Sequence, residues 1–244
     1  MLEVRQLVKN FGALRATDGI DLEVREGETH AIIGPNGAGK TTFISQLAGN
    51  LRPDGGRIVF GGEDITQLSA PRRARKGLAR SFQITSIYPE FTAVANVALA
   101  VQAHASHSFR FWRDARRDPQ LLAPARRVLE DVGLGARANV LAANLSHGEQ
   151  RQLEVAMALA TRPRLLLLDE PMAGMGIEES QRMIAFLATL KGRHTIVLVE
   201  HDVDAVFRLA DRISVLVYGR LIATGAPEAI RANPEVRAAY LGED

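Results

Sequence analysis

Nine consecutive residues near the start of the chain have types and a spacing that suit phosphate binding, Gly34-Pro35-Asn36-Gly37-Ala38-Gly39-Lys40-Thr41-Thr42. They match the pattern G-x-x-x-x-G-K-[ST], in which a glycine-rich loop turns its backbone N–H groups around an anion. Glycines lack a Cβ, which lets the backbone wrap tightly. Lys40 can reach the β- and γ-phosphates, and the Thr41 hydroxyl is placed to bind Mg²⁺. A glycine-rich turn with a chance lysine is the alternative.

The segments on either side of this loop fit phosphate binding. Residues 30–33 are an apolar run that predicts a short buried strand, and residues 41–48 predict the start of a helix. The first turn of a helix has unpaired N–H groups and a partial positive charge. This order of strand, loop and helix favours a phosphate site over a simple turn.

A second apolar run ends in two acids. Residues 165–168 are leucines, which predict a buried parallel strand, and Asp169 and Glu170 follow at its carboxyl end. Open α/β sheets bind ligands at that edge. Asp169 is placed to hold Mg²⁺, directly or through water, and Glu170 is placed to polarise an attacking water as general base. A pair of helix-capping acids after a core strand is the alternative.

Two further positions could contact phosphate. Ser146 and Glu149 have the S-x-x-E spacing of a capping box, which predicts that a helix begins at Ser146. Gly148 lets another molecule approach this first turn, so the helix start is a second candidate anion site, although a capping box alone is usually structural. His201 follows an apolar run at residues 194–200 and can hydrogen-bond a γ-phosphate, although a lone histidine is more often structural.

The remaining segments predict an α/β chain. Alternating residues at 2–8 and 20–24 predict an antiparallel β layer with a turn near Asp18-Gly19. Phe11 lies between these strands and either stacks on a purine ring or fills the core. Further strands are expected at residues 57–60, 213–218 and 220–223, and helices at residues 94–103, 121–132, 148–160, 227–232 and 234–240.

Helical patterns dominate the middle of the chain. We therefore expect one domain in two parts. Residues 1–86 and 161–244 are predicted to form a nucleotide-binding core with the antiparallel β layer. Residues 87–160 are predicted to form an inserted helical subdomain.

The composition excludes several classes of function. Hydrophobic residues make up 46% and charged residues 24%, which is ordinary for a globular protein. The formal net charge is only +2, so no nucleic-acid partner is expected. The absence of cysteine excludes disulfides, Cys-ligated zinc and Cys nucleophiles. No uninterrupted apolar run is long enough to cross a bilayer, so any membrane role is expected to be peripheral.

In this order, the motifs resemble those of the ATP-binding subunits of ABC transporters, and the resemblance covers essentially the whole chain. Residues 34–42 match the Walker A motif, and residues 145–150 match the signature motif. Asp169 matches the Walker B aspartate, and Glu170 matches the catalytic glutamate that follows it. Gln83 matches the Q-loop glutamine, and His201 matches the switch histidine. The resemblance implies ATP and Mg²⁺ as cofactors. It also implies that Gln83 contacts the metal, that Gln83 and His201 sense the γ-phosphate, and that Phe11 stacks on adenine.

The resemblance implies a RecA-like P-loop core with an N-terminal antiparallel β subdomain and an inserted α-helical subdomain. Two subunits, identical or different, are expected to form a head-to-tail dimer. Each ATP would lie between the phosphate loop of one subunit and Ser146, Gly148 and Glu149 of the other. Integral-membrane permease subunits would contact residues 83–91 at the cytoplasmic face of the inner membrane. A solute-binding protein would be an indirect partner.

Finer features are similar to the ATPases of branched-chain amino-acid importers, at residues 79–83, 145–154, 172–175 and 239–242. Importers for urea or short amides share this pattern. A soluble ABC ATPase acting on ribosomes or nucleic acid, and a module that senses ATP without turnover, are the alternatives from other classes.

Two features depart from the usual motifs. His147 replaces the first glycine of the Leu-Ser-Gly-Gly-Gln signature, and residues 173–176 lack the aspartate usual in the loop after Walker B. The second departure puts the contacts of that loop across the dimer in doubt.

Overall fold

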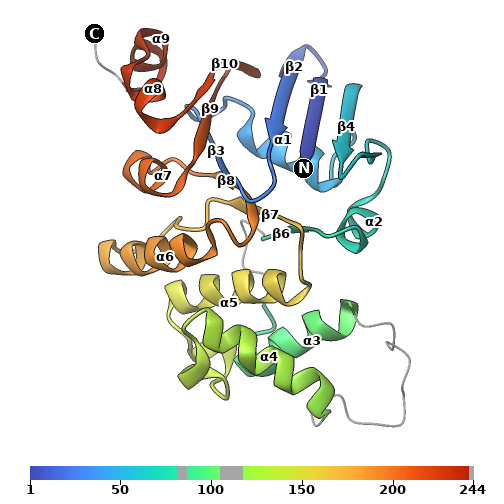
Figure 1. Cartoon of the computed structure of the whole chain (residues 1–244), viewed down its shortest axis with the longest axis vertical. Coiled ribbons are helices and arrows are strands. Elements are labelled where there is room, and N and C mark those ends of the chain that lie inside the picture. Colours follow the sequence, from blue (N-terminus) through green and yellow to red (C-terminus); the bar gives the residue numbers. More distant parts are fainter. Residues whose placement is uncertain (82–86, 105–117, 242–244) are drawn as a thin grey trace.

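The computed structural model describes residues 1–81, 87–104 and 118–241, which form two β-sheets and a set of helices around them (Figure 1). The first sheet is antiparallel and has the strand order β2-β1-β4-β5. Its strands are β1 (Leu2–Phe11), β2 (Leu14–Val24), β4 (Gly55–Phe60) and β5 (Glu63–Asp64).

The second sheet has the strand order β10-β9-β3-β8-β7-β6 and is parallel except for the β9–β10 hairpin. Its strands are β3 (Thr29–Ile33), β6 (Leu78–Arg80), β7 (Leu165–Asp169), β8 (Thr195–Val199), β9 (Arg212–Val217) and β10 (Arg220–Gly225). The central strands β3, β7 and β8 are buried on both faces, as their apolar sequences predict.

Helix α1 (Lys40–Ala48) packs between the two sheets. Phe43 and Ile44 of α1 share one buried cluster with Leu2 of β1 and with Leu165 and Leu167 of β7. Because successive side chains of a strand point to opposite faces, the neighbouring leucines of β7 face a different cluster. The core is thus layered, with α1 fixed on one face of the parallel sheet.

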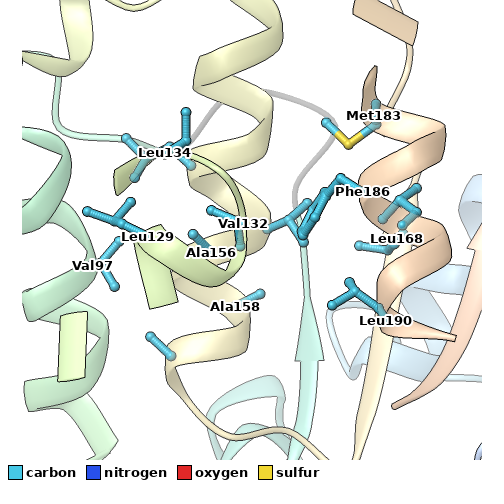
Figure 2. Packing of buried hydrophobic residues seen from close by; sticks show 14 of the residues in the cluster. Val97, Leu129, Val132, Leu134, Ala156, Ala158, Leu168, Met183, Phe186 and Leu190 are labelled. Carbon is cyan, nitrogen blue, oxygen red and sulfur yellow. The ribbon is translucent and has the colours of Figure 1, made fainter. Parts of the chain in front are cut away.

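Helices cover the other face of the parallel sheet. Figure 2 shows a buried cluster that includes Leu168 of β7, Phe186 and Leu190 of α6 (Ile177–Leu190), and Val97 and Leu129 of two further helices. These two are α3 (Ala93–His104) and α4 (Pro119–Asp131), and α5 (His147–Ala160) lies between them and the sheet (Figure 1). The other elements are α2 (Ala70–Arg75), α7 (Val203–Leu209), α8 (Pro227–Ala232), α9 (Pro234–Val236), a π-helical turn at Arg237–Leu241, and 3₁₀ turns at Gly135–Arg137 and Ala142–Asn144.

The predicted turn at Asp18-Gly19 was wrong. Both residues lie inside β2, and the hairpin turn is at residues 12–13. The β1–β2 register shifts next to Asp18-Gly19, and Gly19 has a φ of 68°. This Asp-Gly pair therefore marks a bulge within the strand rather than its end, a position that also selects glycine.

Among the described helices, none has the length and apolar character needed to cross a membrane.

Candidate functional site

The loop between β3 and α1 has the glycines that a phosphate loop needs. A Cβ on Gly34 would lie 2.0 Å from the carbonyl oxygen of Leu216, and one on Gly39 would lie 2.2 Å from that of Ala16. Gly37 has no such neighbour, but its φ of 80° favours glycine. Gly34 and Gly39 are therefore required because neighbouring strands approach the loop too closely for a side chain. The sequence alone did not show this reason.

Lys40 lies buried across this loop. Its ammonium donates to the carbonyl oxygens of Gly34 at 2.6 Å and Pro35 at 3.0 Å. Burial lowers the pKa of Lys40, and the charges of Glu170 and Asp169 oppose that shift. The cation thus contacts the loop carbonyl oxygens, which phosphate oxygens can replace.

Asp169, at the end of β7, is almost completely buried. Its Oδ2 atom accepts a hydrogen bond from Arg80 Nη2 at 2.8 Å. Its Oδ1 atom is buried without a hydrogen-bond partner in the described part of the chain. A buried carboxylate oxygen without a partner is costly unless a ligand completes it, so the site fits a divalent cation. Arg80 was not predicted as a site residue. Its charge within the short strand β6 was the feature that could have indicated a buried acidic partner.

Glu170 follows Asp169 in a strained conformation. Its φ is 48°, in the left-handed region that residues other than glycine rarely adopt. Its N–H donates to the carbonyl oxygen of Val199 in the neighbouring strand at 2.9 Å, which fixes the backbone there. Such strain persists where the surrounding structure imposes it, often at active sites.

Most of the residues predicted to contact the nucleotide line one cavity of about 420 Å³. It is lined by residues 36–42, by Glu170 and by Phe11. Phe11 is 50% exposed, which excludes the alternative that it fills the core. Gln83 lies outside the described residues. His201, the other predicted γ-phosphate sensor, follows β8 with an exposed side chain.

Glu200 is a candidate that the sequence analysis missed. It is completely buried at the end of β8, and burial raises its pKa. Its two carboxylate oxygens accept from the backbone N–H groups of Met172 at 2.9 Å and of His201 at 3.1 Å. Glu200 therefore joins the segment after Glu170 to the histidine. An acid at the end of an apolar strand was the only signal in the sequence.

The second candidate anion site lies at the start of α5. Ser146 Oγ accepts from the Glu149 N–H at 3.2 Å, and the Glu149 carboxylate accepts from the Ser146 N–H at 2.9 Å, which is the predicted capping box. The Ser146 hydroxyl also donates to Glu179 Oε1 at 3.0 Å, and the Gly148 N–H donates to the same atom at 3.3 Å. Both predicted phosphate donors are thus bound to a carboxylate at the start of α6.

Within one chain, the two anion sites are separate. Ser146, Gly148 and Glu179 line a different cavity, of about 340 Å³. It shares no lining residue with the cavity that contains Lys40. A ligand that contacts both sites would therefore need two chains or a large movement.

The two departures from the signature motifs are in contact. His147 Nε2 donates to the carbonyl oxygen of Ala173 at 3.2 Å. A Cβ on Gly174, which has a φ of 76°, would lie 3.3 Å from the same nitrogen. His147 therefore ties the start of α5 to the segment that lacks the aspartate.

Comparisons with known proteins identify the family of the chain. The family model described as ABC transporter matches residues 17–173, and the model described as branched-chain amino acid ATP-binding cassette transporter matches residues 220–244. The high-affinity branched-chain amino acid transport ATP-binding protein BraF of Pseudomonas aeruginosa is 42% identical over 250 residues, with 100% of this chain and 98% of the relative covered. The protein LivG of Salmonella typhimurium, described in the same words, is 39% identical with the same coverage.

Solved structures confirm the predicted fold. The ADP conformation of MJ1267, an ATP-binding cassette of an ABC transporter, superposes with a TM-score of 0.87 and 29% identity, covering 100% of this chain and 99% of that one. A nucleotide-free ATP-binding cassette from an ABC transporter superposes with a TM-score of 0.86 and 28% identity. Because the matches extend over the full length and include the phosphate loop and both acids, the chain belongs to the ABC transporter family and is one of its ATP-hydrolysing cassettes.

Proposed function

We propose that this chain hydrolyses ATP to drive the import of branched-chain amino acids through separate membrane permease subunits. The solute class is supported by two relatives that match the whole chain and by the family model that matches residues 220–244. Importers for urea or short amides are the closest alternatives, because a subunit that only hydrolyses ATP need not touch the solute.

The main structural support for ATP hydrolysis is that Lys40, Thr41 and Glu170 line a single cavity. Transfer of a phosphoryl group to water depends mainly on positioning and on stabilisation of charge. Lys40 would exchange its loop carbonyls for β- and γ-phosphate oxygens, and the N–H groups at the start of α1 would bind the same phosphates. Glu170 would orient the attacking water and accept its proton, and His201 would contact the γ-phosphate.

Mg²⁺ would be held by the Thr41 hydroxyl and by Asp169 Oδ1, which is buried without a hydrogen-bond partner in the described part of the chain. The described residues include no group of three or more acidic or histidine side chains that could hold a metal by themselves, so phosphate oxygens and water would supply the other ligands. When bound, the ion neutralises charge that develops on the phosphates. Arg80 holds the second oxygen of Asp169 and so fixes the direction of the first.

We place the second half of the site on another subunit. Ser146 and Gly148 lie in a cavity separate from that of Lys40. A head-to-tail dimer would bring the α5 helix start of one subunit to the phosphate loop of the other, with Glu149 supporting Ser146 through the capping box. The partner is an identical chain or a similar ATPase subunit.

We place the permease contact beside residues 83–91, at the cytoplasmic face of the membrane, with a solute-binding protein as an indirect partner. An apolar cavity of about 390 Å³ lies next to Ser81, between α2 and α5, and is lined by Ala74, Met157 and Thr161. A cavity of this kind can receive a short segment of a partner protein. Closure of the ATPase dimer would move α5 and transmit force through this contact.

A Glu170→Gln variant tests the chemistry. The amide keeps the size of the side chain but cannot accept the proton, so hydrolysis should fall at least about 100-fold. Binding of ATP, measured by calorimetry, should be unchanged. Glu228→Gln, on α8, is the control and should retain full activity. Hydrolysis by Glu170→Gln at the wild-type rate would exclude Glu170 as the general base.

Isolation of the tagged chain from native membranes in mild detergent tests the transport role. Membrane permease subunits should co-purify, and a second ATPase beside them would identify a heterodimer. The isolated complex can then be assayed with branched-chain amino acids, urea and short amides. Recovery of ribosomal proteins or nucleic acid without a membrane subunit would contradict the transport assignment.

A further inference from the structure

The hairpin between β9 and β10 turns through two residues, Tyr218 and Gly219, that both have left-handed backbones. Their φ angles are 46° and 78°. A two-residue hairpin with positive φ at both positions strongly favours Asn-Gly or Asp-Gly. A tyrosine at the first position is strained, because its Cβ crowds the backbone there. Backbone strain of this kind is an observation from which a functional role can be inferred.

This turn is fixed to the phosphate loop. The Gly219 N–H donates to the carbonyl oxygen of Ala38 at 2.9 Å, and the Gly219 carbonyl accepts from the Asp18 N–H of β2 at 2.8 Å. Asp18 also pairs with Arg15 of its own strand and with Arg220 of β10, at 2.8 and 2.6 Å. The position of Tyr218 is therefore tied to that of the loop.

Tyr218 is one of the residues that line the nucleotide cavity. It is 87% exposed and lines the same cavity as Phe11, Leu14 and Lys40. Among the described residues, six large apolar side chains are exposed, and three of them, Phe11, Leu14 and Tyr218, line this one cavity. An apolar surface beside a phosphate site matches a ligand with a polyanionic end and a flat ring.

We propose that Tyr218 is a second aromatic residue for binding the nucleobase, in addition to Phe11. This inference rests on the proposed function, because it assigns one more residue to the same ATP site. Bases stack on aromatic side chains without much regard to their hydrogen-bonding edge. The base would lie against Tyr218 while the phosphates occupy the loop to which its turn is bound. Ring stacking explains why the turn has tyrosine where asparagine would be less strained.

Substitution of Tyr218 by Asn tests the inference, because the inference predicts weaker ATP binding together with higher thermal stability. The variant should bind Mg-ATP about 10-fold more weakly in calorimetry on the purified chain, since one stacking partner is lost. It should melt a few degrees higher than the wild type, since asparagine suits the left-handed turn. Binding of Mg-tripolyphosphate, which has no base, should be unchanged. Tyr218→Phe should restore ATP binding. Leu141→Asn, at an exposed apolar side chain outside this cavity, should not change it.

Three results would overturn the inference. Wild-type affinity of Tyr218→Asn for ATP would show that the ring does not contact the nucleotide. Equal loss of affinity for ATP and for tripolyphosphate would show that the ring acts only by shaping the phosphate loop. Failure of the wild-type chain to bind either ligand would contradict the proposed function itself, and the stacking role with it.

Discussion

Two helices of this chain begin at candidate phosphate sites, and their first turns are built in opposite ways. α1 begins after Gly39, which has no side chain to cap it, and the Lys40 ammonium lies on the loop carbonyls. α5 begins after Ser146, whose side chain caps it, and both Ser146 and Gly148 donate to the carboxylate of Glu179. The first site therefore presents a cation, whereas the second holds an anion supplied by its own chain.

This difference determines the order in which the two sites can bind phosphate. A nucleotide that enters the first site replaces neutral carbonyl contacts of Lys40 with stronger charge-assisted ones. A phosphate that reaches the second site must first displace Glu179, because two anions cannot use the same donors of Ser146 and Gly148. We expect the first site to bind ATP on a single chain and the second to engage only when a partner supplies additional binding free energy.

The largest expected effect is that of Lys40→Ala. Loss of the ammonium removes a charged hydrogen-bonding group from the phosphates. ATP binding to the isolated chain should weaken by about 100-fold, or about 2.8 kcal/mol. Calorimetry with Mg-ATP measures this loss.

Ser146→Ala is the corresponding variant at the second site. Binding of ATP to the isolated chain should be unchanged, whereas hydrolysis at high protein concentration should fall about 10-fold. Because the variant also loses a helix cap worth about 1 kcal/mol, Asp118→Ala at the cap of α4 is the matched stability control. Equal weakening of ATP binding by Lys40→Ala and Ser146→Ala would remove the distinction between the sites.

The first site could be predicted from the sequence because its parts are neighbours along the chain. A run of nine residues, 34–42, contains the loop, the lysine and the helix start. Asp169 and Glu170 follow a run of leucines, which alone places them at the edge of a parallel sheet. The α/β class also follows from these local patterns, because apolar strands on both sides of a helix imply a layered α/β core. The RecA-like core with its two subdomains was expected from the family resemblance.

The second site could be predicted only in part, because its decisive contact joins distant residues. Glu179 is 33 positions after Ser146 and belongs to no motif. At the first site, the pair of Arg80 and Asp169 was missed for the same reason, because it spans 89 positions. Pairings of this kind are set by how the sheet and helices pack, which a local pattern does not contain.

Helix α2 was missed for a related reason. It is short and rich in arginine, so no apolar period marks it. Its Arg73 is 1% exposed and donates to the carbonyl oxygens of Gln46 and Leu47 at the end of α1. Burial lowers the pKa of Arg73 to about 10. The arginine acts as a cap for α1, a role that depends on tertiary structure.

A smaller effect is expected from Glu179→Ala, which tests whether the carboxylate competes with phosphate. Its removal frees the donors of Ser146 and Gly148. The ATP concentration that gives half-maximal hydrolysis should therefore fall about threefold to tenfold. A rise in that concentration would instead show that Glu179 holds Ser146 in the productive position.

Glu178→Ala is the matched control for this measurement. Glu178 also lies in the first turn of α6, so its loss changes the charge near the helix start equally. It is exposed, and its ion pair with Arg182 is long, at 3.9 Å. The half-saturating concentration should not change, and an equal change in both variants would attribute the effect to general charge.

The smallest effect is the pH dependence of the contact between Glu179 and the start of α5. The hydrogen bond from Ser146 lowers the pKa of Glu179 below its ordinary value of 4.5, and the Gly148 N–H adds to this. A carboxyl whose pKa is lowered in the folded state adds stability above its ordinary pKa, and this stability is lost as the pH falls through the lowered value. Urea unfolding should therefore show a constant difference between wild type and Glu179→Ala near neutral pH and a shrinking one below about pH 4.5. A difference that stays constant to pH 3 would mean that the charged carboxylate is not what occupies the second site, and the contrast between the two helix starts would then rest on Lys40 alone.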